Sequence, residues 1–167
     1  MKIFFVFVSC LFAVSSFAEN IQQVKYQLPK AAENWVVHNK LENEKGTTIV
    51  YTPKEVEKQE AKEFFGVNAN RLSINPNNSE ALKLGLTKLF PNMKIDFRIL
   101  EKDKDSVIYE WSAQENGAQK IHGLGRAFST KEGSVVLGYQ TQNISNIQQA
   151  RSVWLQALKE AKQEANK

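Results

Sequence analysis

The segment IHGLGRAF, residues 121–128, combines residue types that catalytic corners and phosphate-binding loops use. His122 stands beside Gly123 and Gly125, and an arginine follows. A dinucleotide-binding loop of the form G-x-G-x-x-G needs a third glycine, here at Phe128, and a helix directly after it. Neither feature is present, because the following residues have the pattern of a strand. The segment therefore predicts a β-strand with two structural glycines.

Neighbouring strands explain why this strand needs glycines. If three-residue turns join the strands, Gly123 lies opposite Tyr109, and Gly125 lies opposite Tyr139. A glycine in a strand leaves a gap that a large ring on the next strand can fill. We therefore predict that the two glycines make room for aromatic rings.

The same pairing brings polar residues into line on the opposite face of the sheet. Asp96 is expected opposite Glu110, with His122 beside them and Arg98 and Arg126 on the diagonals. Two carboxylates beside a histidine could bind a metal or act as acid and base. Charge pairing across a half-exposed face is the alternative, and we favour it because no cysteine and only one histidine is available there. The sequence thus assigns no catalytic, cofactor-binding or metal-binding residue, and no cofactor is expected.

Other sequence motifs of enzymes are also missing. No Gly-x-Ser-x-Gly elbow, Walker loop, zinc-protease motif or calcium loop occurs. The pattern of aromatic residues predicts that they pack in the hydrophobic core. The alternative is that they line a site for an apolar ligand between the sheet and the last helix. That alternative predicts a cavity lined by Tyr109, Trp111, Tyr139 and Trp154.

The N-terminus has the layout of a secretory signal peptide over residues 1–18. Lys2 precedes an apolar run over 3–14, and small residues lead to Ala18 at the expected cleavage site. Cys10 is the only cysteine, and it lies inside the apolar run, which favours a signal peptide over a lipoprotein anchor. We therefore predict an exported protein, periplasmic or extracellular, without disulfides.

The composition of residues 19–167 indicates which kinds of partner this part of the chain can have. Without Lys2, lysine and arginine number 21 (22 − 1) against 18 acidic residues, and the charges are interspersed. This pattern indicates a solvated surface and argues against nucleic acid as a partner. No second apolar run reaches membrane length, so no transmembrane segment is expected in the mature chain.

Hydrophobic periodicity predicts one α+β domain over residues 19–167. It has an antiparallel sheet of six to seven strands, of which the last four form a meander. A mid-chain helix and a long C-terminal helix are expected to pack on that sheet. The expected elements are strands over 21–28, 35–42, 47–52 and 61–69, a helix over 79–90, strands over 93–100, 107–113, 121–129 and 135–141, and a helix over 146–164.

This order of elements, with stretches such as GTTIVYTP and SVVLGYQTQNISNIQQARSVWLQAL, resembles the fold shared by the photosystem extrinsic protein PsbP and the Ran nucleotide-release factor. The resemblance implies a binding or adaptor scaffold and carries over no functional residue. A helix-grip lipid-binding fold is the competing architecture, but it normally has two helices after the first strand.

The sequence as a whole predicts an exported, non-enzymatic binding or adaptor protein of a bacterium. We expect it to act through another protein, and a role in host interaction fits export. A carrier of an apolar ligand or lipid is the alternative function.

Overall fold

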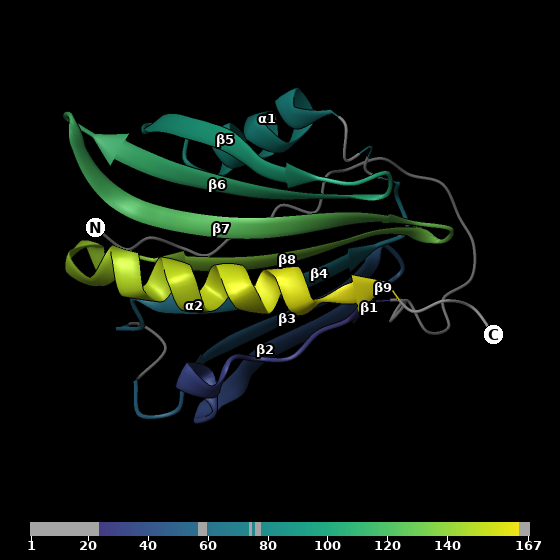
Figure 1. Cartoon of the computed structure of the whole chain (residues 1–167), viewed down its shortest axis with the longest axis horizontal. Coiled ribbons are helices and arrows are strands. Elements are labelled where there is room, and N and C mark those ends of the chain that lie inside the picture. The colour runs from purple at the N-terminus through teal and green to yellow at the C-terminus, as the bar shows by residue number, and fades with distance from the viewer. Residues whose placement is uncertain (1–23, 57–59, 74, 76–77, 164–167) are drawn as a thin grey trace.

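The computed structural model describes residues 24–56, 60–73, 75 and 78–163, so the predicted signal peptide lies outside the described residues. Within them the chain forms one seven-stranded antiparallel sheet with the strand order β2-β3-β4-β8-β7-β6-β5. Figure 1 shows α2 lying along one face of this sheet, with α1 close to β5 and β6. The predicted α+β class, the sheet and its C-terminal meander are confirmed.

The strands of the large sheet are β2 (Trp35–Asn43), β3 (Gly46–Pro53), β4 (Glu63–Asn70), β5 (Lys94–Lys102), β6 (Ser106–Glu115), β7 (Ala118–Thr130) and β8 (Gly133–Thr141). The helices are α1 (Ser79–Leu89) and α2 (Ile147–Glu160), with 3-10 turns at η1 (Lys30–Ala32) and η2 (Ile144–Asn146). Two short strands, β1 (Val24–Lys25) and β9 (Lys162–Gln163), pair with each other in a separate sheet.

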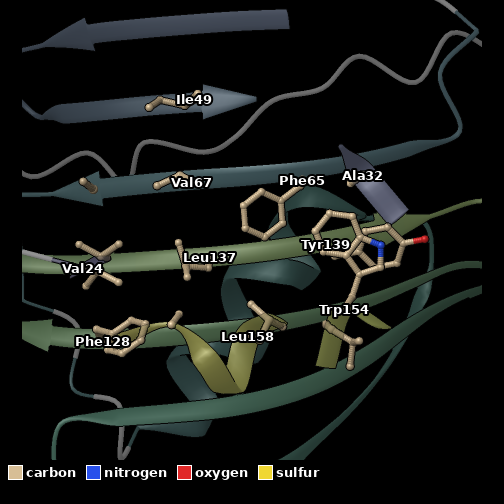
Figure 2. Close-up of a cluster of buried hydrophobic side chains, with 14 residues drawn as sticks. Val24, Ala32, Ile49, Phe65, Val67, Phe128, Leu137, Tyr139, Trp154 and Leu158 are labelled. Atoms are coloured by element: carbon tan, nitrogen blue, oxygen red, sulfur yellow. The ribbon is translucent and has the colours of Figure 1, made fainter. Parts of the chain in front are cut away.

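One face of the sheet holds an aromatic core beneath α2. The indole of Trp154 stacks on Tyr139 with ring centroids 4.5 Å apart, and on Phe65 at 5.1 Å. Figure 2 shows these three rings together, with Leu158 one turn further along α2. Stacked aromatic pairs contribute about 0.5–1.5 kcal/mol beyond the apolar area that they bury. This stack fixes the position of α2 on the sheet.

The opposite face packs against α1. The helix begins with an Asn78 side chain that accepts a hydrogen bond from the Ala81 amide, and its apolar side meets a second buried cluster. Phe90, just after the helix, lies 5.3 Å from the ring of Trp111. The helices therefore cover opposite faces, as the mixed polarity of the strands predicts.

Gly123 and Gly125 lie beneath aromatic rings on β6, although not the predicted ones. A Cβ at Gly123 would stand 2.2 Å from the indole of Trp111, and a Cβ at Gly125 would stand 2.3 Å from the ring of Tyr109. Both distances are too short for any side chain. The structural interpretation of the two glycines is thus supported, but the expected pairing of Gly123 with Tyr109 is wrong.

The β6–β7 register differs from the prediction by two residues, for two local reasons. The turn has two residues, Asn116 and Gly117, both with positive φ, where three were expected. A bulge between Ala113 and Gln114 adds the second shift. A shift of two residues keeps every side chain on its predicted face.

The β7–β8 register differs by one residue, which has a larger effect. Thr130 pairs with Gly133, so Tyr139 lies opposite Leu124 and not opposite Gly125. A shift of one residue moves a side chain to the other face of the sheet. Tyr139 consequently belongs to the core beneath α2, away from Tyr109.

The chain ends of the domain also differ from expectation. Within the described part of the expected first strand, residues 24–28, only Val24–Lys25 is a strand. The α2 helix ends at Glu160 rather than at residue 164. The β9 strand after α2 had no signal in the hydrophobic pattern, because it is exposed and pairs only with β1.

Candidate functional site

A cleft of about 640 Å³ opens where β5, β6 and β7 meet the first turns of α2. Four side chains define it, and we call it the Glu110 cleft: Arg98 on β5, Glu110 on β6, His122 on β7 and Arg151 on α2. Three of these elements are neighbouring strands whose residues were predicted to lie together, whereas α2 was not expected to contribute.

Glu110 is a buried carboxylate held by two arginines. Its side chain is only 6% exposed. The Nε of Arg151 donates to Oε1 at 2.7 Å, and the Nε of Arg98 donates to Oε2 at 2.7 Å. Burial alone would raise the pKa of Glu110, but the hydrogen bonds and charges of Arg151 and Arg98 outweigh it and hold that pKa below its usual value. Glu110 is therefore ionised at neutral pH and is not a proton donor.

His122 lies against this carboxylate without a hydrogen bond to it. Its Nε2 is 3.3 Å from Oε1 of Glu110, within ion-pair distance, yet the two groups are not aligned for a hydrogen bond. Burial lowers the pKa of His122, and although Glu110 acts in the opposite direction, Arg151 and Arg98 lower it further. His122 is therefore a neutral imidazole with one nitrogen that finds no partner among the described residues.

Asp96 is displaced from the position that the sequence predicts. It pairs with Ser112, and Arg98 takes the place opposite Glu110. The Asp96 carboxylate instead accepts from Gln114 at 2.6 Å, at the outer rim of the cleft. The expected contact between two carboxylates is thus wrong, and the destabilising repulsion that it implied does not arise.

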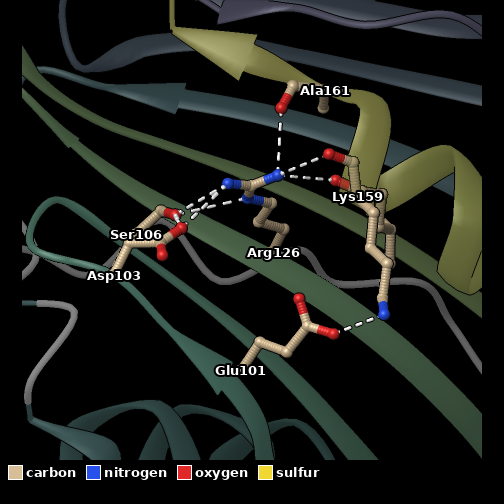
Figure 3. Close-up of polar contacts among 7 residues, drawn as sticks. Glu101, Asp103, Ser106, Arg126, Lys159 and Ala161 are labelled. Atoms are coloured by element: carbon tan, nitrogen blue, oxygen red, sulfur yellow. Dashed lines mark hydrogen bonds and ion pairs between the residues drawn. The ribbon is translucent and has the colours of Figure 1, made fainter.

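Arg126 does not join the cluster at all. Figure 3 shows its guanidinium at the other end of α2, beside Ser106 and Asp103. One terminal nitrogen donates to the carbonyl oxygens of Leu158, Lys159 and Ala161, at 3.0, 3.1 and 3.0 Å. Arg126 thereby satisfies the last carbonyl groups of the helix, which lack partners within the helix itself.

The remaining contacts of Arg126 leave none of its nitrogens unused. Nε and the second terminal nitrogen both donate to Oγ of Ser106, and that second nitrogen also lies 3.3 Å from Asp103. The guanidinium plane lies 4.6 Å from the ring centroid of Phe128. Its role is structural.

The four aromatic residues predicted to line one apolar cavity lie on two faces of the sheet. Tyr139 and Trp154 stack on each other beneath α2, whereas Tyr109 and Trp111 belong to the cluster beneath α1. The four therefore cannot line a common cavity between the sheet and α2. The register shift at β7–β8 separates Tyr139 from Tyr109, and Trp154 lies apart from Tyr109 because α2 packs on the face that holds Tyr139.

Arg151 is the site residue that the sequence analysis missed. It lies on the side of α2 that packs on the sheet, four residues after Ile147 and three before the buried Trp154. A cation within an apolar stripe of a helix is itself a signal, because it needs a buried acidic partner. Recognising it would have required knowing that Glu110 lies beneath the first turns of α2.

The cleft presents two arginines and one imidazole around a single ionised carboxylate. In the described part of the chain, no three His, Cys, Asp or Glu side chains come together as a set able to hold a metal ion. Ser112 lines the cleft and pairs with His122 across the sheet, but its side chain does not bond to Nε2 of His122. What the cleft offers is fixed positive charge beside a neutral imidazole.

A second exposed feature lies at the far edge of the sheet. β2 pairs with β3 on one side only, and no described strand occupies its other side. It exposes Val36, Val37 and Leu41, at 40%, 53% and 58%. The opposite edge, β5, instead carries mainly charged side chains on its exposed positions.

Comparison with known proteins supports the fold. No family model and no curated protein sequence matches the chain. Among solved structures, the solution structure of cyanobacterial PsbP (CyanoP) from Synechocystis sp. PCC 6803 is similar, with a TM-score of 0.60 and 8% sequence identity. The match covers 89% of this chain and 97% of the cyanobacterial protein. The predicted PsbP-like fold is thus supported, and no finer relationship follows from this likeness.

None of the described helices is long and apolar enough to span a membrane.

Proposed function

We propose that this protein is an exported, non-enzymatic binding protein of a bacterium that acts by holding a protein partner. The PsbP-like fold and the signal-peptide pattern support the proposal. The observation that carries it is the open β2 edge with its exposed apolar side chains.

Sheet edges that face only water are normally blunted by charged residues, short strands or proline. β5 follows this rule, with Lys94, Asp96 and Arg98 in its exposed positions. β2 is nine residues long and has no proline, and besides the exposed ion pair of Lys40 and Glu42 it exposes three apolar side chains: Val36, Val37 and Leu41. An extended segment of a partner could add to this edge through main-chain hydrogen bonds and cover the apolar side chains.

The charged groups of the Glu110 cleft support a non-catalytic role. Glu110 is ionised and bonded by two arginines, and His122 has no nucleophile bonded to it. General acid–base catalysis requires a group that gains or loses a proton near the operating pH and touches a reacting atom. These residues provide fixed charge instead.

Photo-crosslinking in the cells that produce the protein tests this proposal. A benzophenone amino acid replaces Val37 on β2, and in a matched variant it replaces Ile99 on β5, which is also an exposed apolar residue. We expect one protein adduct from position 37 and none from position 99. Excess unlabelled protein should compete for that adduct, whereas protein carrying Val37→Lys and Leu41→Lys should not.

Three results would overturn the proposal. Equal labelling from both edges would show non-specific contact. Adducts of the chain with itself alone would indicate a homo-oligomer. An apolar small molecule that co-purifies while no protein adduct forms would favour the alternative carrier function.

A further inference from the structure

The Glu110 cleft has hydrogen-bonding capacity that its own residues do not use. Arg98 and Arg151 each donate to Glu110 through Nε and one terminal nitrogen. The other terminal nitrogen, Nη1, of each guanidinium has no hydrogen-bond partner among the described residues. Two planar donor groups are thus fixed in place by one buried carboxylate, with one edge of each left available.

His122 adds an independent indication of a ligand. Its side chain is only 7% exposed, and it lines the cleft. Its Nε2 is buried without a hydrogen bond. A buried polar atom without a partner costs about 1–3 kcal/mol, so such atoms usually mark a site that something else satisfies.

The charges of the cleft select a monoanion. Among the residues that line the cleft, Arg98 and Arg151 balance the charges of Glu110 and Asp96 while His122 is neutral. Lys94, which pairs with Asp96 beside the cleft, adds one positive charge. A dianion such as phosphate would exceed this charge and stand beside Glu110. A single carboxylate matches it and also matches the fork geometry of a guanidinium.

The α2 end of the cleft points to the same ligand class. Ile147 and Gln148, the first two residues of α2, line the cleft, and the first turn of α2 contains no acidic residue. A helix N-terminus carries partial positive charge, and the first turn of α2 has no acidic residue of its own to neutralise it. Ile147 also supplies an apolar wall, and a volume of about 640 Å³ suits a small organic molecule.

We propose that the Glu110 cleft binds a carboxylate group through Arg98, Arg151 and His122. The carboxylate belongs either to a free organic acid with a small apolar body or to a protein partner. Only the second source rests on the proposed function, and the first is independent of it.

Side-chain NMR of the exported protein tests the proposal. The Nε–Hε signals of the arginines and the ring signals of His122 are followed during separate titrations with benzoate, with inorganic phosphate, and with a short peptide whose C-terminus is either free or amidated. We expect saturable shifts at Arg151 and His122 with benzoate or with the free-carboxylate peptide, and weaker effects of phosphate.

Arg98→Gln is the diagnostic variant, because Arg98 is largely exposed and Arg151 still pairs with Glu110 after its loss. It should weaken carboxylate binding about tenfold, as expected for the loss of a charged hydrogen bond. Lys102→Gln is the matched control, since it removes the same charge from the exposed end of the same strand. It should change the affinity by less than about twofold, because an exposed charge at that distance is screened.

The outcomes distinguish a free organic acid from a carboxylate of a protein. They also distinguish failure of the carboxylate site from failure of the proposed protein-binding function. Binding of benzoate supports a free acid, and binding of only the free-carboxylate peptide supports a carboxylate of a protein. Absence of saturable shifts with either probe, tighter binding of phosphate, or equal weakening by the two variants overturns the carboxylate site. None of these results alters the crosslinking at Val37, which decides the protein-binding function separately.

Discussion

The two ends of α2 contact buried charged residues of opposite sign, Arg126 and Glu110. The polar groups around these two residues differ in how completely they are hydrogen-bonded. At the C-terminal end, Arg126 donates through all three of its nitrogens, to three helix carbonyl groups and to the side chains of Ser106 and Asp103. Near the N-terminal end, Glu110 is bonded by two arginines, yet Nε2 of His122 beside it has no partner.

Both charges suit the helix dipole, since the cation lies at the negative end of α2 and the carboxylate lies near the positive end. The surroundings differ, however. Arg126 is 12% exposed, whereas Arg98, which helps to neutralise Glu110, is 66% exposed and faces a cleft. The contrast indicates that the Arg126 cluster serves the fold alone, while the Glu110 cluster retains capacity for a ligand.

The largest expected effect is at Arg126. Arg126→Met leaves three carbonyl oxygens and the Ser106 hydroxyl without their donor, so we expect a loss of about 3 kcal/mol or more in the free energy of unfolding. Arg126→Lys keeps the charge but lacks the planar fork, and it should lose about half as much. Urea denaturation measures both, and a loss below about 1 kcal/mol for Arg126→Met would show that water replaces these contacts.

Glu110→Gln is expected to be milder, because both arginines can be hydrated once the carboxylate is gone. We expect a loss of about 1–2 kcal/mol at neutral pH. The depressed pKa of Glu110 contributes stability above the ordinary carboxyl pKa of 4.5, and this contribution is lost as the pH falls through the lower folded-state pKa. The variant should therefore lose less stability than the wild type on acidification below about pH 4.5.

His122 predicts a pH dependence in a different window. Its pKa is lower in the folded protein than the ordinary 6.5, so the unfolded chain binds more protons and stability falls as the pH drops below about 6.5. One proton gives a slope of at most about 1.4 kcal/mol per pH unit. His122→Gln should flatten the stability curve between about pH 7 and pH 5, whereas His38→Gln, at the only other histidine, should not. An unchanged slope in His122→Gln would assign the dependence to other groups.

Arg98→Gln should have the smallest effect on stability, about 1 kcal/mol or less, because Arg98 is largely exposed and Arg151 still pairs with the buried Glu110 after its loss. The small loss of stability expected for Arg98→Gln distinguishes the Glu110 cluster most clearly from the Arg126 cluster. A cost near that of Arg126→Met would mean that Arg98 is as much a part of the fold as Arg126.

The sequence predicts the faces of the strands better than their pairing. Alternation along β5, β6 and β7 is a local property, so Glu110, His122 and Arg98 could be placed on one face before any register was known. Their partners depend on turn length and on the bulge at Ala113–Gln114, which the hydrophobic pattern does not reveal. Shifts of two residues left the predicted faces intact.

Tyr139 and Arg151 show where this reasoning fails. The turn between β7 and β8 is one residue shorter than expected, so Tyr139 lies on the opposite face of the sheet. Tyr139 therefore cannot line the predicted apolar cavity together with Tyr109. Arg151 belongs to the site only because α2 crosses the sheet above Glu110, and a helix-crossing position is set by packing such as the Trp154 stack. Sequence periodicity identifies the buried side of a helix but not what lies beneath it.

The pairing of β1 with β9 has a consequence for how the chain assembles. Val24 lies opposite Gln163, so a contact that spans nearly the whole domain joins its earliest strand to its latest. Such a contact carries a high loop-closure entropy while the intervening chain is unfolded, and a low one after the large sheet has formed. We therefore expect β1 to pair with β9 last, after the large sheet has folded.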